Sequence, residues 1–208
     1  NSLGGLVKFV TVKPKLGEFE ARVRAGFELT DGGSEGYSGN AVVNVPLGDS
    51  LAMRASGYYR KSGGFIDTIG IDREDANDFE SYGGRASLLF EPTTNFSVRL
   101  TALAQNIRAN SQAAFDVDPV THDPIAEDPA TGDALDGRLV RTEYFPEKND
   151  VDYRLYSGTI GWDFGPASFT SVTSYAKLDQ SEAYDVTYQL PGIADAIYGG
   201  LYPDAGPL

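Results

Sequence analysis

The sequence predicts an all-β protein whose strands follow one another in an antiparallel up-and-down meander. Three observations lead to this prediction. Apolar and polar residues alternate along successive segments, short turns alternate with long connections, and glycine, tyrosine and phenylalanine are abundant, with 24, 12 and 11 residues among 208. A chain rich in glycine and aromatic residues, with little helix-favouring sequence, is typical of β folds.

The alternation is clearest in residues 19–30, FEARVRAGFELT. Every second residue from Phe19 to Leu29 is apolar, and the residues between them are charged, polar or small. Because successive side chains of a strand point to opposite faces, this segment predicts a strand with one apolar and one polar face. Similar patterns predict seven strands, at residues 18–30, 36–46, 50–62, 80–91, 96–108, 152–165 and 167–188.

Tight and long connections alternate between these strands. The tight turns contain Pro, Gly, Asp or Asn and occupy residues 46–50, 91–95 and 165–167. The long loops occupy residues 31–36, 63–79 and 109–150. Short turns at one edge and long loops at the other are typical of outer-membrane β-barrels, whereas a Greek-key sandwich places long connections at both ends.

The charge of the chain follows the same division. Residues 63–79 carry five acidic and one basic side chain, and residues 109–150 carry ten and three, so these loops supply −11 of the net charge of −13. The strands are therefore nearly neutral, and the acidic residues gather at one edge. A negative chain of this kind argues against nucleic acid as a partner.

Aromatic residues lie near the ends of the predicted strands, where a membrane-interface girdle is expected. They are Tyr37, Tyr58, Tyr59, Phe65, Tyr82, Phe90 and Phe96. In a lipid-embedded sheet, arginine would be poorly tolerated at Val43 or Leu100 and better tolerated at Asn44 or Thr101, on the polar face.

No catalytic or metal-binding pattern emerges from the sequence. Cysteine is absent, and His122 is the only histidine, which excludes a disulfide, a thiolate site, a multi-histidine metal site and a histidine-based triad within this chain. The acidic loop at residues 116–137 lacks the spacing of an EF-hand, so a calcium site there competes with a plain solvated loop. We therefore expect no enzyme, no cofactor and no metal centre.

The first fourteen residues, NSLGGLVKFVTVKP, differ from the rest. Taken alone, they predict a short apolar strand at residues 6–12 after a glycine turn. The run resembles the close of the plug domain in TonB-dependent outer-membrane receptors, which usually show a Gly-Gly pair, a short hydrophobic strand with a Thr, and a basic residue before Pro. The segments NVPLGDSLAMRASGYYRKSGGFID and FTSVTSY are also similar to that family. The resemblance covers the whole chain and is densest over residues 1–67.

This resemblance implies a 22-stranded transmembrane β-barrel that encloses an N-terminal plug, in the outer membrane of a Gram-negative bacterium. Residues 1–14 would be the C-terminal end of the plug, and residues 15–208 the N-terminal part of the barrel. About seven strands cannot close such a barrel, so we expect a fragment. The implied partners are outer-membrane lipid, a small-molecule or metal-chelate cargo, and the TonB energy-transducing system, reached through a segment absent from this chain. The implied cargo is a scarce ligand such as a ferric siderophore, haem, cobalamin or a carbohydrate.

The resemblance also gives roles to candidate site residues. Five arginines on the polar strand face would line the lumen and meet plug carboxylates: Arg22, Arg24, Arg54, Arg85 and Arg99. Three loop aromatics would contact cargo at the mouth, or else only pack the loop upon itself: Phe115, Tyr144 and Phe145. Two alternatives remain, a small self-standing β-barrel and a soluble β-sandwich carbohydrate-binding module. In a sandwich the arginines would simply be solvated.

The opening segment separates these hypotheses. As the last plug strand, residues 6–12 would lie against the polar face of the sheet, with Pro14 and Gly17 marking the passage to the barrel wall. In a soluble sandwich, Leu6, Phe9 and Val10 would instead pack against the apolar face.

Overall fold

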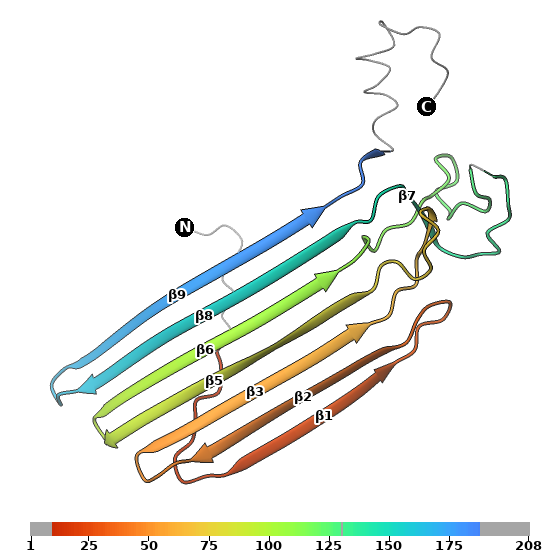
Figure 1. Cartoon of the computed structure of the whole chain (residues 1–208). Helices are drawn as coiled ribbons and strands as arrows, with labels where there is room; N and C mark the ends of the chain where they lie inside the picture. Colours follow the sequence, from red (N-terminus) through yellow and green to blue (C-terminus); the bar gives the residue numbers. More distant parts are fainter. Residues whose placement is uncertain (1–9, 130, 188–208) are drawn as a thin grey trace, which may run out of the picture.

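The computed structural model of the chain describes residues 10–129 and 131–187. Its main element is a seven-stranded antiparallel sheet in the order β1-β2-β3-β5-β6-β8-β9, and β4 and β7 form a separate two-stranded parallel sheet (Figure 1). The strands are β1 (Glu20–Glu28), β2 (Gly36–Pro46), β3 (Leu51–Ser62), β4 (Asp67–Gly70), β5 (Phe79–Thr93), β6 (Phe96–Ala109), β7 (Val140–Glu143), β8 (Lys148–Asp163) and β9 (Ser168–Ala183). The predicted all-β antiparallel meander is confirmed, as an open sheet.

The seven long strands match the seven predicted ones, and each pairs with its neighbour along the meander. The short strands β4 and β7 were not predicted. Each has only four residues, and they pair in parallel from Asp67 with Val140 to Gly70 with Glu143. Four residues are too few for a period to show, and the pairing joins loops that are distant in sequence. In the described part of the chain, no helix is long and apolar enough to cross a membrane.

The predicted division between turns and loops is also confirmed. The connections β2–β3, β5–β6 and β8–β9 lie together at one end of the sheet, and the long connections lie at the other (Figure 1). In the last turn, Gly165 has a φ of 89°, a conformation that favours glycine. The Phe164 amide donates to the Ala167 carbonyl across this turn at 2.9 Å.

The register assigns every strand residue to one of two faces, because residues paired directly across a ladder share a face. One continuous row is apolar and consists of Ala21, Val43, Ala55, Ala86, Ala102, Tyr156 and Tyr175. The adjacent row on the opposite face is polar and consists of Glu20, Asn44, Arg54, Ser87, Thr101, Ser157 and Ser174. The alternation seen in the sequence is therefore kept in phase across all seven strands.

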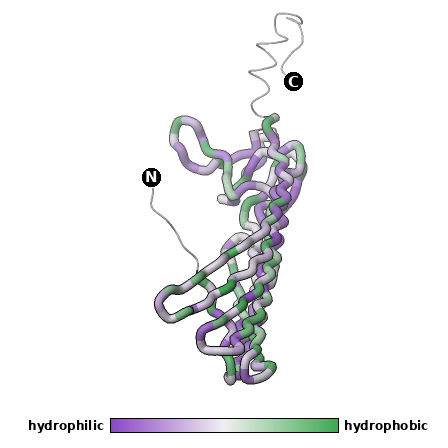
Figure 2. Tube along the Cα trace, turned by 90° about the vertical axis from the view of Figure 1, so that its left-hand side faces the viewer, coloured by the Kyte–Doolittle hydropathy of each residue, from purple (hydrophilic) through white to green (hydrophobic). Residues whose placement is uncertain are grey.

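Burial on the two faces is the reverse of that in a soluble sheet. On β5, Leu88 and Phe90 of the apolar face are 36% and 41% exposed, whereas Ser87 and Leu89 of the polar face are only 2% and 5% exposed. On β1, Val23 of the apolar face is 77% exposed. Figure 2 shows the sheet turned nearly edge-on, as a single layer. The apolar face is thus uncovered by the described residues, and exposed apolar surface of this extent is typical of interaction surfaces.

The start of the described chain lies on the polar face. The side-chain amide of Asn44, which is fully buried, accepts a hydrogen bond from the Lys15 amide and donates to the carbonyls of Lys15 and Glu18. Figure 1 shows this segment passing behind the sheet before it reaches β1. Gly17 makes the bend, with a φ of 68°, and Pro14 is buried.

Two expectations for this region need correction. Residues 10–12 are not in a strand, so the strand predicted at residues 6–12 is wrong for that part. Residues 1–9, including Leu6 and Phe9, lie outside the described residues. Asn44 was expected to tolerate arginine, but residues 15–18 cover it, so we now expect arginine there to be costly.

Candidate functional site

The apolar face carries a row of aromatic residues near each end of the strands. Towards the loops, Tyr59 stacks with Tyr37 and Tyr82, at ring-centroid distances of 5.8 and 6.5 Å. Towards the turns, the Trp162 ring lies 5.7 Å from Phe96 and 4.6 Å from Phe164. Aromatic side chains therefore bound the exposed apolar surface on both sides.

Most of the aromatic residues predicted to lie near strand ends belong to this face, but two do not. Tyr58 lies on the polar face, where its hydroxyl hydrogen-bonds the Ser81 hydroxyl at 3.0 Å. Phe65 lies in the loop between β3 and β4. The two adjacent tyrosines of β3 must point to opposite faces, so only Tyr59 can join the aromatic row.

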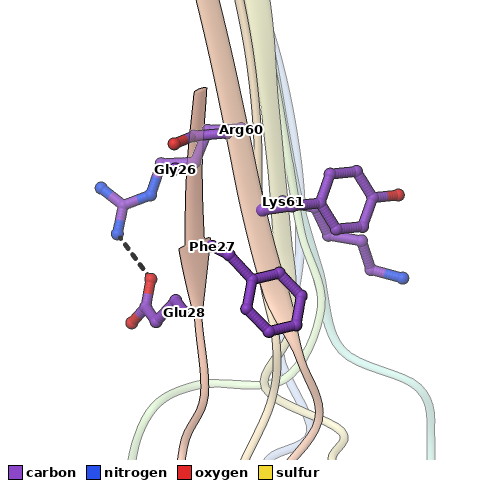
Figure 3. Close-up of a pocket in the computed structure, with 7 residues that line it drawn as sticks. Gly26, Phe27, Glu28, Arg60 and Lys61 are labelled. Carbon is purple, nitrogen blue, oxygen red and sulfur yellow. Dashed lines mark ion pairs between the residues drawn. The ribbon is translucent and has the colours of Figure 1, made fainter. Parts of the chain in front are cut away.

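A shallow hollow at the loop ends of β1, β2 and β3 does not form a binding site. Figure 3 shows Glu28 and Arg60 on one side of the sheet, joined by a 3.5 Å ion pair, and Phe27 and Lys61 on the other. The register gives the same division between the two faces. The side chains around the hollow therefore do not converge on one ligand.

The polar face brings together the five arginines predicted to share it: Arg22, Arg24, Arg54, Arg85 and Arg99. Glu20 supplies the negative charge among them, with ion pairs of 3.0 Å to Arg54 and 3.5 Å to Arg22. Among the residues that the structure describes, the other three arginines have no carboxylate partner within ion-pair distance. This part of the polar face therefore carries an excess of positive charge.

Arg85 has no carboxylate partner among the described residues. It is partly desolvated, and the positive charges of Arg99 and of the paired Arg54 act on it. Like charges at short range are unfavourable, and partial burial reduces the screening by water. Such a cluster is stable where a counter-anion is normally present.

The two longest loops form one compact unit at the other end of the strands, which we call the loop cap (residues 63–78 and 110–147). The parallel pairing of β4 with β7 joins them, and the Arg138 guanidinium forms a 3.1 Å ion pair with Asp67. Ile66, Leu135 and Val140 are almost completely buried in it. The loop cap therefore has a small core of its own.

Acidic side chains are buried at the base of the loop cap. Glu143 is fully buried and accepts hydrogen bonds from the Ser111 hydroxyl at 2.5 Å and the Glu147 amide at 2.9 Å. Glu147 is 2% exposed and forms a 2.7 Å ion pair with Arg141. The sequence analysis missed this network, since acidic residues in a loop are usually solvated and only the folded loop reveals their partners.

Asp185, which follows β9, fastens the next segment of the chain to this network. Its carboxylate accepts hydrogen bonds from the amides of Tyr144 and Phe145, at 2.5 and 3.2 Å, and its own amide donates to Glu147. Burial raises the pKa of Asp185, but hydrogen bonds from Thr187, Tyr144 and Phe145 outweigh it and hold this pKa at about 2. The carboxylate therefore stays charged where it holds the cap.

The three aromatic candidates all belong to the loop cap. Phe115, Tyr144 and Phe145 are 41%, 50% and 67% exposed. The Asp116 amide bonds to the Val140 carbonyl, which places the segment of Phe115 beside β7, and Tyr144 lies against Gly70 of the other loop. The rings therefore stand on a structured base.

The loop cap also contains a tandem repeat that the sequence analysis missed. Residues 117–126 and 127–136 share the pattern D-P-x-T-x-D, and each forms a small antiparallel bridge. The first turn is capped by Asp118, whose carboxylate accepts two backbone hydrogen bonds at 2.8 Å. His122 and Gly132 hold equivalent positions with φ values of 64° and 78°. The sequence feature that could have revealed it is the D-P-x-T-x-D pattern, which occurs twice within one loop.

The acidic side chains of the loops do not form a metal site. Within the described ranges, no three acidic or histidine side chains are grouped so that they would hold a metal ion. His122 is exposed at the tip of the first repeat.

Comparison of the chain with protein-family models, with curated proteins and with solved structures gave no match.

Asp185→Ala should loosen the base of the loop cap, because the Tyr144 and Phe145 amides lose a buried acceptor. We expect a local cost of about 1–3 kcal/mol, measured by hydrogen exchange of residues 141–147. Asp179→Ala is the control, since Asp179 lies on β9 but pairs only with the exposed Lys177. Equal exchange in both variants would contradict the role of Asp185.

The same contact should depend on pH. The pKa of Asp185, about 2, lies below its ordinary value of 3.8. Its contribution to cap stability is therefore fully present above about pH 4 and is lost as the pH falls through 2. Exchange of the Tyr144 amide, corrected for its intrinsic rate, should rise over that interval. In Asp185→Ala the rise should be absent.

Proposed function

We propose that this chain is part of the wall of an outer-membrane β-barrel, with its apolar face on lipid and its polar face on the barrel interior. The observation that carries this proposal is the reversed burial of the sheet. A continuous apolar face stands uncovered between two aromatic rows, and the polar face holds the buried groups. Transmembrane barrels have this arrangement, with an apolar band outside, aromatic girdles at its borders and a polar interior.

The height of the apolar band supports the proposal. Tyr82 and Phe90 lie on the same face of β5, and at about 3.4 Å per residue they are about 27 Å apart along the strand. Barrel strands tilt by about 35–45°, which reduces this to a height of about 20 Å. That is close to the height of about 25 Å typical of the lipid-facing band.

The two edges of the sheet support a larger barrel. β1 and β9 are the outer strands, and β9 is exposed along almost its whole length of 16 residues. Long unpaired edges invite further pairing, and a barrel removes them by closure. We infer that further strands of the whole polypeptide pair with both edges and complete a barrel of 22 strands.

Within that barrel, we infer a TonB-dependent receptor that takes up a scarce ligand and makes or breaks no bond. Residues 15–18 support an N-terminal plug, because Asn44 holds their backbone on the polar face, which would be the barrel interior. The five arginines would meet carboxylates there. The loop cap would lie at the outer mouth, where Phe115, Tyr144 and Phe145 would be available to cargo.

Leu100→Arg tests the lipid contact. Leu100 is 54% exposed in the middle of the apolar face. In the intact barrel, arginine there should cost about 2–4 kcal/mol, because it places a charge in hydrocarbon. The control is Ser157→Arg, at nearly the same depth on the polar face. Asn44 is unsuitable as a control because its amide holds residues 15–18.

The measurement is equilibrium unfolding of the complete protein in lipid vesicles. Equal tolerance of both arginines would mean that the apolar face does not look onto lipid. A large cost at Ser157 with none at Leu100 would contradict the proposed orientation, because the polar face would then be the one that meets hydrocarbon.

Arg99→Glu tests the counter-charge on the polar face. In residues 1–208 alone, it should stabilise the sheet slightly, because it relieves the repulsion on Arg85. In the complete protein, it should destabilise by about 1 kcal/mol or more, because plug carboxylates would then face a like charge. Thermal unfolding of both forms measures whether each is stabilised or destabilised. Stabilisation in both forms would contradict an acidic partner on this face.

A further inference from the structure

Asn44 is fully buried, although it lies on a strand of the open sheet. Its side chain forms three hydrogen bonds, all with the backbone of the segment that precedes β1. The amide oxygen accepts from the Lys15 N–H at 2.9 Å, and the amide nitrogen donates to the carbonyls of Lys15 at 2.9 Å and Glu18 at 2.6 Å. One side chain of β2 thus binds the backbone at two points, in both directions.

Ion pairs surround this contact. The Lys15 ammonium lies 3.0 Å from Glu18 and 3.6 Å from Glu20, and Glu20 forms a 3.0 Å ion pair with Arg54 of β3. The hydrogen bond to Glu18 raises the pKa of Lys15 above its ordinary value. The Lys15 side chain therefore ties the segment to β1, and Glu20 joins that ion pair to β3, besides the backbone contact with Asn44.

Residues 10–13, which precede this contact, are not held against the sheet in this way. Val10 and Val12 are 80% and 56% exposed, and within the described structure no hydrogen bond joins residues 10–13 to the sheet. Pro14 is buried at the border. The hold on the chain therefore begins at residues 14–15 and is continuous from there into β1.

We propose that Asn44 is an anchor that makes residues 15–18 part of the sheet, so that the chain before Pro14 can move without drawing β1 away from β2. β1 is an outer strand with nine residues, and a force on its start would break its ladder one hydrogen bond at a time. The hydrogen bonds of Asn44 to Lys15 and Glu18 would resist such a force before it acted on the β1–β2 ladder. The inference rests on the proposed function only for what precedes the anchor, a plug that shifts during uptake.

In the alternative account, residues 15–18 cover Asn44, but the Asn44 amide does not fix them to the sheet. The two accounts differ in what happens to the segment when the amide is removed. If the amide is the anchor, residues 15–18 become as free as residues 10–13. If the ion pairs or Pro14 hold the segment, the loss of the amide changes little.

The test uses the complete protein. In the unaltered protein, the Lys15 amide should exchange with solvent at least about tenfold more slowly than the Lys13 amide, although neither is in a strand. Equal rates would overturn the proposal without any variant. This measurement does not depend on whether Asn44 variants fold.

Variants of Asn44 then test whether its side chain protects the Lys15 amide from exchange. Asn44→Ala should raise exchange at Lys15 and trypsin cleavage after Lys15 by about tenfold or more, because three hydrogen bonds are lost. Asn40→Ala, an exposed position on the same strand and face, should leave both unchanged. Asn44→Asp keeps the acceptor for the Lys15 amide but sets a buried carboxylate oxygen against the carbonyls of Lys15 and Glu18, so its effect should be at least as large as that of Asn44→Ala. The proposal fails if Asn44→Ala behaves like Asn40→Ala.

These outcomes are independent of the membrane test. Loss of protection in Asn44→Ala supports the anchor even if Leu100→Arg and Ser157→Arg are tolerated equally. Conversely, if Leu100→Arg is costly but the Lys15 amide is unprotected, the barrel-wall proposal is supported and the anchor proposal fails.

Discussion

The structure depends on the antiparallel backbone ladder, because no second layer of described residues covers the apolar face of the sheet. A sandwich is stabilised by burial between two sheets, whereas here the long strands are held by hydrogen bonds to their neighbours. In hydrocarbon this is the one way for extended chain to satisfy its N–H and C=O groups, which is why closed barrels span membranes and open edges do not. In the barrel wall proposed above, that requirement would account for the nearest-neighbour order, the long strands and the tight turns at one end.

Because the apolar face is exposed, the buried groups of the sheet lie on its polar face. It carries the groups that a core would normally exclude, and their partners differ by position. Near the turns, Asn44 is satisfied by the backbone of residues 15–18, and Glu20 by Arg54. Farther along, Arg85 and Arg99 have no acidic partner in the described chain. At the loop end the strands give way to a cap whose own small core and buried carboxylates stabilise it separately.

The alternation of apolar and polar residues predicted the strands and their two faces. It did not predict features that depend on contacts between segments distant in sequence. The alternation from Phe19 to Leu29 was enough to place β1 and its faces, and the turn residues were enough to orient the meander. By contrast, β4 and β7 are too short to show a pattern, and they exist because two loops meet. The burial of Asn44 and Glu143 depends on segments that are remote in sequence, so a polar strand residue and a loop carboxylate both looked solvated. Tyr58 was misplaced because only one of two adjacent tyrosines can share the face of Tyr82.

The separation of charge bears on what the arginines face. The loops are strongly acidic, whereas the polar face near Arg85 is basic, and Arg85 is about 20 Å along β5 from the loop end at Phe79. At physiological ionic strength the field of each region fades within about 8 Å, so the two do not neutralise each other. An anionic ligand arriving from outside would meet repulsion at the loop cap before it felt the arginines. A fixed carboxylate delivered from the N-terminal side would not, because residues 10–18 already approach along the polar face. The charge pattern therefore favours a counter-charge built into the same polypeptide over one carried by cargo.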